Sequence, residues 1–556
     1  MLAIMPLTTL AQDLIWVQDY EMPSMGNAGA RIFTSTTDGQ GHTFVTGTFA
    51  GNSDLDPGPS TVSFLSKGFL DVFISRFDAD GQQLWTSVIG GSQYEYAYDV
   101  ALDPQGDVIL CGSFSGTVDF DPGPGTMEAT AIHDQDLYLL KLSGDDGSLI
   151  WLRTNGGNEL DECQEVALDP AGNIIALGVS YGTMDMDPGP ATSPLTSDRN
   201  FIWKLTNDGD YIWSGALPGE DAVHLRGLSI FSNGDFVIAG KNWGTLDLDP
   251  TAGSTIIGSS GIFVARYSAA GQLLWERHLN GGFINDMVLD TQGNIVLGGE
   301  IGITDGQVDL DPGPGTDLHA TDREFEAFIW KLDGNGDHLW SRALPSSSDS
   351  RLYAIATDAM GNVRCTGTYF ADLDADPGPG EHILPYSYPE PMTEDAYVLG
   401  LDADGGFLWA GAIAGTGLER TSGVGTDDQG NLFVVGIHHG ETDFDPGPGT
   451  DLHTGPSPLN AGSNFILRLS AALPMSIATD DVPSTIIHPN PTDDRIQVST
   501  SGPAGYTLFN LQGQLMSSGT STDMRTTLDL SPFPAGAYVL KLHTEKGIED
   551  HVVVKR

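Results

Sequence analysis

Residues 71–85 read DVFISRFDADGQQLW, and the chain continues with ALDPQGD at 101–107, VILCGSF at 108–114 and VDFDPGPG at 118–125. The apolar and alternating segments are typical of short β-strands, and the Asp/Gly clusters between them are typical of turns. The same segments recur in the same order along most of the chain, without the apolar periodicity of an amphipathic helix. The sequence therefore predicts an all-β repeat protein.

The repeat is counted most easily from the motif Asp-x-Asp-Pro, whose second aspartate recurs at intervals of 65, 66, 62, 62, 65 and 69 residues. The aspartate pairs are Asp54/Asp56, Asp119/Asp121, Asp185/Asp187, Asp247/Asp249, Asp309/Asp311, Asp374/Asp376 and Asp443/Asp445. A unit of this length accommodates about four short strands. Seven such units fit a β-propeller better than a solenoid, because radial closure removes exposed sheet edges.

A Leu-Trp or Ile-Trp pair marks each unit, and in six of the seven a glycine stands four residues before the tryptophan. The tryptophans are Trp16, Trp85, Trp151, Trp213, Trp275, Trp340 and Trp409. The first unit begins at Leu14-Ile15-Trp16 without the preceding strand, and the last unit supplies only that strand, NFILRL at 464–469. We therefore predict a seven-bladed β-propeller over residues 12–470, closed by pairing of its N- and C-terminal strands.

The D-x-x-G-x-x-L-W turn resembles the tryptophan-docking repeat of quinoprotein-type propellers, and the whole unit resembles secreted bacterial seven-bladed propellers. The resemblance implies that each tryptophan packs flat between neighbouring blades. The seven tryptophans are then structural, which is also the ordinary interpretation of a core aromatic residue.

The composition narrows the choice of partners. Acidic residues number 75 and basic residues 24, which gives a net charge of −51. Such a charge repels phosphate backbones and anionic lipids, so neither nucleic acid nor a membrane surface is an expected partner. No apolar run is long enough to span a bilayer. Cys111, Cys163 and Cys365 have no CxxC spacing, so neither a disulfide framework nor a cysteine zinc site is indicated.

The two ends of the chain differ from the repeat. Residues 1–11 are apolar and end in small residues, as in a signal peptide, but lack a positive n-region, so we interpret them as a truncated signal peptide. Residues 471–484 are expected to form a linker. Residues 482–556 contain 6 basic and 7 acidic side chains, so the acidity belongs to the repeat region and the tail is a separate domain.

Residues 485–556 alternate like a small Ig-like β-sandwich. The segment closely resembles the type A C-terminal sorting domain of type IX secretion substrates. The resemblance implies a Bacteroidota-type cell, export to the periplasm, recognition by the type IX secretion machinery, and release to the cell surface or medium. The residues that carry it as a sorting signal are Pro489, Asn490, Pro491, Gly513, Gly536, Tyr538, Lys555 and Arg556.

The Asp-x-Asp-Pro loops have two interpretations. Carboxylates two residues apart point the same way on an extended chain and offer the oxygen ligands that calcium takes, which makes all fourteen aspartates candidate calcium ligands. Alternatively, aspartate before Pro-Gly forms a turn by accepting hydrogen bonds from its own backbone. The fourth copy, Asp249-Pro-Thr-Ala-Gly, lacks Pro-Gly-Pro and would be the weakest calcium site. No other cofactor is predicted.

The sequence contains only weak matches to motifs of catalytic residues. Gly178-Val-Ser180-Tyr-Gly182 matches a nucleophile elbow, but Ser180 aligns with Phe49 and Phe114 of other units, and no helix is predicted after it. We therefore expect an exported, non-enzymatic binding or structural protein with a glycan, protein or matrix ligand. The insertions at 382–395 and 321–326 are its predicted binding loops. The alternative is a secreted hydrolase or lyase with its site at the propeller channel.

Overall fold

The computed structural model describes residues 12–20, 29–58, 61–197, 199–220, 223–258, 260–302, 307–319, 324–387, 393–455, 462–471, 485–488, 495–500, 504–510, 514–521, 525–544 and 547–555. Every helix or strand assigned in these ranges is a β-strand, which confirms the all-β prediction. Contacts divide the chain into two units, Met1–Pro474 and Met475–Arg556, which are described separately. The predicted signal peptide at 1–11 and residues 472–484 of the predicted linker lie outside the described residues.

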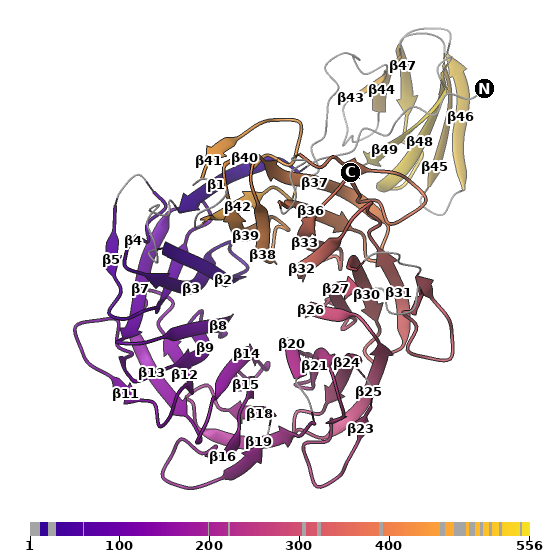
Figure 1. The fold of residues 1–556 in the computed structure, drawn as a ribbon. Helices are drawn as coiled ribbons and strands as arrows, with labels where there is room; N and C mark the ends of the chain where they lie inside the picture. Colours follow the sequence, from indigo (N-terminus) through magenta and orange to yellow (C-terminus); the bar gives the residue numbers. More distant parts are fainter. Residues whose placement is uncertain are drawn as a thin grey trace. The chain divides into compact units, whose positions relative to one another are not determined.

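The described strands of the first unit include seven antiparallel groups of four, arranged in a ring (Figure 1). We number these groups sheets 1 to 7. Their first, innermost strands are β2 (Gly29–Thr37), β8 (Glu95–Leu102), β14 (Glu162–Leu168), β20 (Val223–Ile230), β26 (Phe283–Leu289), β32 (Ser350–Thr357) and β38 (Glu419–Thr426). The second strands are β3 (Thr43–Ala50), β9 (Val108–Phe114), β15 (Ile174–Val179), β21 (Phe236–Asn242), β27 (Ile295–Ile301), β33 (Val363–Tyr369) and β39 (Leu432–His438).

The outer two strands of each sheet follow in the same order. The third strands are β6 (Asp71–Phe77), β12 (Asp136–Leu142), β18 (Asn200–Leu205), β24 (Gly261–Tyr267), β30 (Glu326–Leu332), β36 (Asp395–Leu401) and β42 (Ser463–Leu469). The fourth strands are β7 (Gln83–Gly91), β13 (Leu149–Asn155), β19 (Tyr211–Leu217), β25 (Leu273–Asn280), β31 (His338–Ala343), β37 (Phe407–Gly415) and, in sheet 7, β1 (Leu14–Tyr20).

Sheet 7 combines the two ends of the unit. Its fourth strand β1 pairs antiparallel with β42, with Val17 opposite Leu467. Each first strand contacts the first strand of the next sheet, and β38 contacts β2.

A two-stranded hairpin accompanies each sheet, so a unit has six strands rather than the four expected from the sequence. The turn of each hairpin is an Asp-x-Asp-Pro loop. The hairpins are β4 (Asn52–Asp54) with β5 (Ser63–Leu65), β10 (Thr117–Asp119) with β11 (Glu128–Thr130), β16 (Gly182–Asp185) with β17 (Pro194–Ser197), β22 (Leu246–Asp247) with β23 (Ile256–Ile257), β28 (Val308–Asp309) with β29 (Leu318–His319), β34 (Leu373–Asp374) with β35 (Ile383–Leu384), and β40 (Glu441–Asp443) with β41 (Leu452–Thr454).

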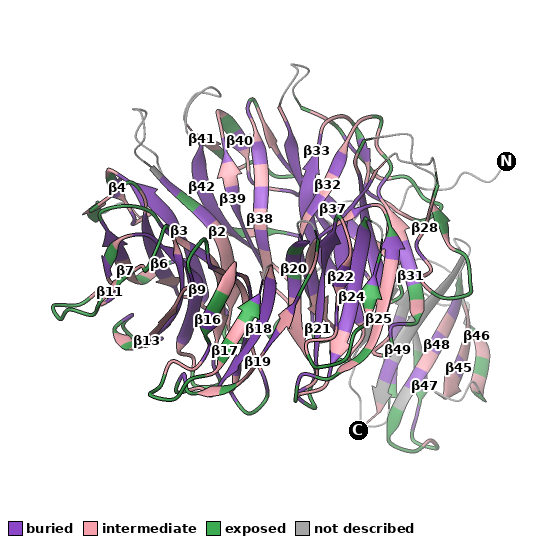
Figure 2. Cartoon of the chain, turned by 60° about the horizontal axis from the view of Figure 1, so that its bottom comes forward, coloured by how far each residue is buried: buried purple, intermediate pink, exposed green. Residues whose placement is uncertain are grey.

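The apolar core lies between neighbouring sheets rather than within one. Val296 and Ile329 of sheet 5, for example, share a buried cluster with Leu352 and Val363 of sheet 6. Among the described residues, seven such clusters each join two neighbouring sheets, including sheets 7 and 1. The second and third strands are consequently the most deeply buried (Figure 2).

The tryptophan of one sheet docks on a turn glycine of the next sheet. Gly336 has a φ of 78°, and a Cβ there would lie 2.9 Å from a ring carbon of Trp275. The indole Nε1 of Trp275 donates to the Gly334 carbonyl of the same turn at 3.2 Å. The equivalent close pairs are Trp16–Gly81, Trp85–Gly147, Trp213–Gly271 and Trp340–Gly405. In these five pairs the turn glycine is therefore the seat for the preceding sheet's tryptophan, whereas a Cβ on Gly209 would meet Arg153.

Basic residues stabilise the same turns. Lys331 lies opposite Trp340 in the strand register, and its Nζ reaches both Asp290 Oδ2 of its own sheet and the Ala403 carbonyl of the next, each at 2.9 Å. Arg342, two residues after the tryptophan, donates to the Gly405 carbonyl. Ten residues that contact these turns, which we call the turn-face basic residues, are Arg76, Lys141, Arg153, Lys204, Arg266, Arg277, Lys331, Arg342, Arg364 and Arg468.

The second unit contains two antiparallel sheets that share one buried apolar cluster. One sheet consists of β43 (Thr485–His488), β44 (Arg495–Thr500) and β47 (Arg525–Asp529). The other consists of β45 (Ala504–Asn510), β46 (Leu515–Ser521), β48 (Gly536–Thr544) and β49 (Gly547–Lys555).

The docking contact predicts a difference between two turn glycines. Gly336 and Gly106 have φ of 78° and 85°, but a Cβ on Gly106 would meet nothing within 4 Å. Alanine strains the backbone equally at both positions, whereas only Gly336→Ala also displaces an indole. We expect Gly336→Ala to destabilise the protein by about 1–3 kcal/mol more than Gly106→Ala, measured by urea unfolding. Equal losses would contradict the role assigned to the tryptophan seat.

Candidate functional site

The first unit has two faces that differ in how regular they are. The turn face carries the loops that join first to second strands and third to fourth strands. The variable face carries the loops at the opposite ends of the strands. A binding or catalytic site is expected on the face whose side chains depart from the repeat pattern, because the repeat does not need such side chains for its own packing.

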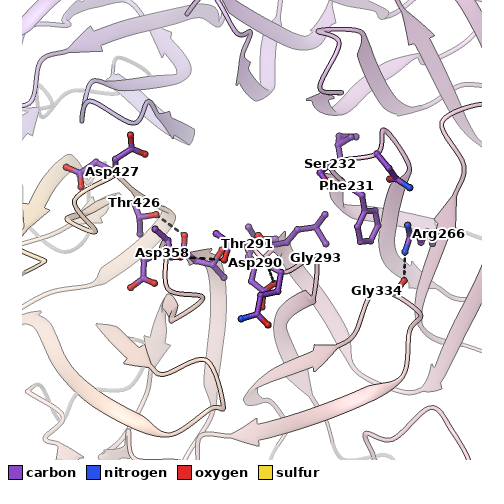
Figure 3. A pocket seen from close by; sticks show the side chains of 18 residues that line it. Phe231, Ser232, Arg266, Asp290, Thr291, Gly293, Gly334, Asp358, Thr426 and Asp427 are labelled. Atoms are coloured by element: carbon purple, nitrogen blue, oxygen red, sulfur yellow. Dashed lines mark hydrogen bonds between the residues drawn. The ribbon is translucent and has the colours of Figure 1, made fainter. Parts of the chain in front are cut away.

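The turn face holds two cavities of about 810 and 800 Å³ around the ends of the first strands. Figure 3 shows the first of them. Asp290 is typical of their lining: its Oδ1 accepts the N–H groups of Gln292 and Asn294, and its Oδ2 pairs with Lys331. Burial raises the pKa of Asp290, but these hydrogen bonds outweigh burial and lower the pKa overall. The repeated aspartates of this face therefore cap turns.

Sheet 4 lacks this aspartate and uses a different arrangement. Phe231 occupies the position, and the Arg266 guanidinium lies 3.9 Å from the centre of its ring. Asp235, at the end of the same turn, takes over the ion pair with Arg266 at 2.8 Å. The cation is thus retained at the turn by another carboxylate and a cation–π contact.

The first aspartate of each Asp-x-Asp-Pro loop is occupied by the loop backbone. Asp119 Oδ1 accepts the N–H groups of Asp121 and Met127, at 3.2 and 2.9 Å. All seven copies repeat these hydrogen bonds to the residues two and eight positions after the first aspartate. The seven acceptors are Asp54, Asp119, Asp185, Asp247, Asp309, Asp374 and Asp443.

The second aspartate of each loop is occupied in the same way. Asp121 Oδ1 accepts the N–H of Gly123 at 2.8 Å, and a Cβ on Gly125 would lie 2.1 Å from Asp121 Oδ2. In every copy the Oδ1 atom accepts the N–H of the residue two positions later. The seven acceptors are Asp56, Asp121, Asp187, Asp249, Asp311, Asp376 and Asp445. In each of the fourteen candidate calcium ligands, one carboxylate oxygen thus accepts a hydrogen bond from a backbone N–H of the same loop.

The fourth copy keeps this geometry without Pro-Gly-Pro. Both the N–H and the hydroxyl of Thr251 donate to Asp249 Oδ1, and Ser254 Oγ donates to Asp247 Oδ2 at 2.7 Å. Pro250 also lies against Gly215 of the sheet before it, where a Cβ would approach within 2.5 Å. These contacts favour the turn interpretation of the loops.

The structure does not bring the candidate calcium ligands of different units together. Within the described residues, no group of three His, Cys, Asp or Glu side chains is arranged to hold a metal ion. Six of the second aspartates cap a Pro-Gly turn: Asp56, Asp121, Asp187, Asp311, Asp376 and Asp445. Calcium binding by the fourteen aspartates thus stays a prediction that depends on backbone carbonyls completing each loop.

The tail residues have structural partners where they are described. Tyr538 is buried, and its hydroxyl donates to the Pro534 carbonyl. Lys555 Nζ donates to the carbonyls of Leu530 and Phe533, at 3.0 and 2.8 Å. Gly536 begins β48. The remaining sorting residues lie outside the described part of the chain: Pro489, Asn490, Pro491, Gly513 and Arg556.

Ser180 has no catalytic surroundings. It is buried at the end of β15 and is followed by the short strand β16 rather than by a helix. Its place in the repeat thus matches the structural interpretation of the Gly-x-Ser-x-Gly pattern.

The first strands line the centre of the ring, and each contains a β-bulge at the same register position. The bulged residues are Phe33, Tyr98, Gln164, Arg226, Asn285, Tyr353 and Ser422. The residues two positions earlier are Arg31, Tyr96, Glu162, His224, Phe283, Arg351 and Arg420. These two positions differ in side-chain chemistry from sheet to sheet, so the repeat is broken on the variable-face side of the channel. Bulges are common where a strand re-aims side chains toward a site.

Three carboxyl groups follow the bulges. Burial raises the pKa of Asp99 and of Asp286 to about 7 each, and burial together with the charge of Asp99 raises that of Glu165 well above its usual range. Asp99 Oδ2 accepts the N–H of Val166 in the next sheet at 2.9 Å, and Asp286 Oδ2 accepts that of Ile355 at 2.8 Å. Two of the three carboxyl groups thus join neighbouring first strands.

Both predicted binding loops end at the variable face. Phe325, the residue before β30, lies under the Arg351 guanidinium, 4.6 Å from its ring centre. Glu394, the residue before β36, accepts a hydrogen bond from Arg420 Nε at 2.7 Å. Residues 321–323 and 388–392 of the two insertions lie outside the described residues.

Comparisons with known proteins give a family match for the second unit and distant likenesses for the first. The family model of the secretion system C-terminal sorting domain matches residues 486–555. An uncharacterized WD repeat-containing protein of Acanthamoeba polyphaga mimivirus is 21% identical over 445 residues, covering 64% of this chain but only 31% of that relative. The Dos1 propeller is 9% identical, covers 83% of this chain and 96% of its own, and has a TM-score of 0.38. A europium-containing methanol dehydrogenase is 10% identical, with coverages of 82% and 92% and a TM-score of 0.34.

The ring of antiparallel four-stranded sheets makes the first unit a β-propeller. The match to the family model makes the second unit a sorting domain of the type IX secretion system. The chain is thus a propeller protein delivered by type IX secretion. Its sorting domain implies recognition by that machinery and secretion or attachment at the outer surface. Within the described residues, the model has no helix that could span a membrane.

The hydrogen bonds of the Asp-x-Asp-Pro loops predict how they respond to substitution. An asparagine Oδ1 accepts the same N–H groups as an aspartate but carries no charge. We expect Asp119→Asn/Asp121→Asn to melt as the wild-type protein does, in calcium and in EDTA alike. Asp119→Ala should lose about 1 kcal/mol of stability because two N–H groups lose their acceptor. A calcium-dependent melting temperature that the asparagine variant loses would show instead that the loops bind metal.

Proposed function

We propose that the protein is an exported, non-enzymatic binding protein, in which a closed seven-bladed propeller presents its variable face to an extracellular glycan, protein or matrix ligand. The propeller comprises residues 12–470, and residues 485–556 form an Ig-like sandwich that serves as the sorting domain. The seven sheets, the pairing of β1 with β42 and the contact of β38 with β2 support the closed ring.

One observation carries the assignment of the binding face. The turn face repeats similar caps and basic residues around the ring. The first strands instead present a mixture of basic, acidic, aromatic and polar side chains at the bulge position and at the position two residues before it. A repeat protein needs no such variation for stability, because every sheet packs on its neighbour in the same way. The variation is what a surface selected for an asymmetric ligand would show.

The channel carboxyl groups support a binding role over an enzymatic one. Raised pKa values are a property that a general acid needs, and Asp99 and Asp286 have them. Both groups, however, accept two backbone N–H bonds, one of which comes from the neighbouring sheet. A group held in this way stabilises the ring and is poorly placed to exchange protons with a substrate.

The assignment is tested by locating the face that holds a ligand. The full chain is applied to arrays of bacterial extracellular glycans and proteins, alongside Arg226→Ala on the variable face and Gln429→Ala on the turn face. Both residues are exposed. We expect the variable-face variant to lose retention and the turn-face variant to keep it. Loss through Gln429→Ala alone, or chemical conversion of a retained glycan seen by mass spectrometry, would contradict the proposal.

A further inference from the structure

The described basic residues of the propeller fall into two groups. The ten turn-face basic residues contact turns on that face. The others lie at the strand ends or loops of the variable face, or at the bulge of β20: Arg31, Lys67, Arg199, Arg226, Lys241, Arg351 and Arg420. The chain has a net charge of −51. Its described basic residues that do not contact turns thus lie mostly on the variable face.

Five of these cations are held against aromatic rings, namely Arg199 in sheet 3 and four cations in sheets 4, 6, 7 and 1. Arg351 lies between Phe325 and Phe370, at 4.6 and 5.6 Å from the ring centres. Lys241 lies 4.8 Å from Phe283 and 5.9 Å from Trp243. Such contacts fix the direction of each cation without neutralising its charge.

Arg420 and Arg31 continue the arrangement into sheets 7 and 1. Arg420 lies 5.7 Å from the Tyr353 ring, and Arg31 lies 5.3 Å from the Phe33 ring. Desolvation lowers the pKa of Arg31, and the positive charge of Arg420 lowers it further, so the two cations lie close together. We call this set of residues the collar: Arg31, Phe33, Lys241, Trp243, Phe283, Phe325, Arg351, Tyr353, Phe370 and Arg420.

Three of the collar rings, Trp243, Phe283 and Phe325, form a connected series. The centres of Trp243 and Phe283 are 6.0 Å apart, and those of Phe283 and Phe325 are 6.4 Å apart. Trp243 is 37% exposed and therefore open to a ligand. Cations at intervals, separated by aromatic surface, thus extend over sheets 4 to 7 and sheet 1.

The carboxyl groups nearest the collar pair with one of its four cations. Glu394 pairs with Arg420. Burial raises the pKa of Glu300, which faces Arg351, to about 7 and that of Glu419, next to Arg420, to about 9. Glu419 is accordingly protonated at neutral pH. The Nε of Arg351 is buried and has no hydrogen-bond partner among the described residues.

We propose that the collar binds an acidic polysaccharide, with sugar carboxylates on its arginines and sugar ring faces on its aromatic side chains. This inference rests on the proposed function and specifies its ligand class. The guanidinium fork accepts a planar carboxylate through two parallel hydrogen bonds. The rings between the cations offer apolar faces to the C–H side of a pyranose, so charged and apolar groups alternate in both partners.

The same features make other polyanions poorer occupants. A single-stranded nucleic acid is bound along a continuous basic groove that follows its phosphates, whereas the collar cations stand on separate strands with aromatic rings between them. An acidic peptide supplies carboxylates but no flat apolar face between them. The delivery of the protein to the outer surface also places the collar among extracellular polysaccharides.

The test measures binding of oligogalacturonate to the full chain by calorimetry, with a neutral malto-oligosaccharide of equal length as reference. Arg31→Ser and Arg351→Gln remove collar cations, and Arg199→Ser is the matched control. Arg199 also lies over an aromatic ring, that of Tyr181 at 5.6 Å, on the same face but outside the collar. We expect each collar variant to weaken binding at least about tenfold and the control to bind as wild type.

Tryptophan fluorescence provides a second measurement that can be used if an arginine variant of the collar unfolds. Trp243→Phe should abolish the ligand-induced change in tryptophan fluorescence while preserving the affinity to within about threefold. Oligogalacturonate binding no tighter than malto-oligosaccharide, equal binding of poly-glutamate or single-stranded DNA, or collar variants that fold and bind normally would overturn the inference. Retention of a neutral glycan or a protein on the variable face would then leave the proposed function standing.

Discussion

The docking of a tryptophan on the next sheet's turn glycine is the contact on which the propeller depends. It needs a left-handed glycine such as Gly336 on one side and a flat ring such as Trp275 on the other, with a basic side chain beside them. Five of the seven sheets contact their neighbour in this way, and among them Trp16 of β1 lies on Gly81 of sheet 1. Because the contact joins turns at one face, it leaves the opposite strand ends free to vary.

The repeat spacing predicted the all-β architecture and the structural role of the tryptophans, because both follow from residue types that recur at fixed intervals. It did not predict the outer hairpins, since a two-residue strand such as Leu246–Asp247 has no detectable alternation. The role of Lys331 was also hidden: its partner carbonyl at Ala403 lies 72 residues away, and only the three-dimensional stacking of sheets brings them together.

The candidate site was less predictable than the fold. The regular Asp-x-Asp-Pro loops were predicted as candidate calcium sites. Their hydrogen bonds, such as that from the Met127 N–H to Asp119, instead stabilise the backbone of the loop. The varied positions of the first strands were not predicted as site residues. Arg31, Arg351 and Arg420 nevertheless occupy one register position, which an alignment of the seven first strands would have revealed. The role of the two insertions as binding loops stays a prediction. Phe325 and Glu394 at their ends contact collar arginines, and these arginine partners lie on other strands.

The central claim is that the propeller uses one set of basic residues to hold its sheets together and another to face a ligand. Arginine modification by phenylglyoxal, followed by peptide mass spectrometry on the native full chain, measures this division directly. The account predicts rapid modification of Arg31 and Arg226, which are exposed, and protection of Arg266 and Arg468, whose guanidinium groups contact turns. Equal rates at the two sets would contradict it.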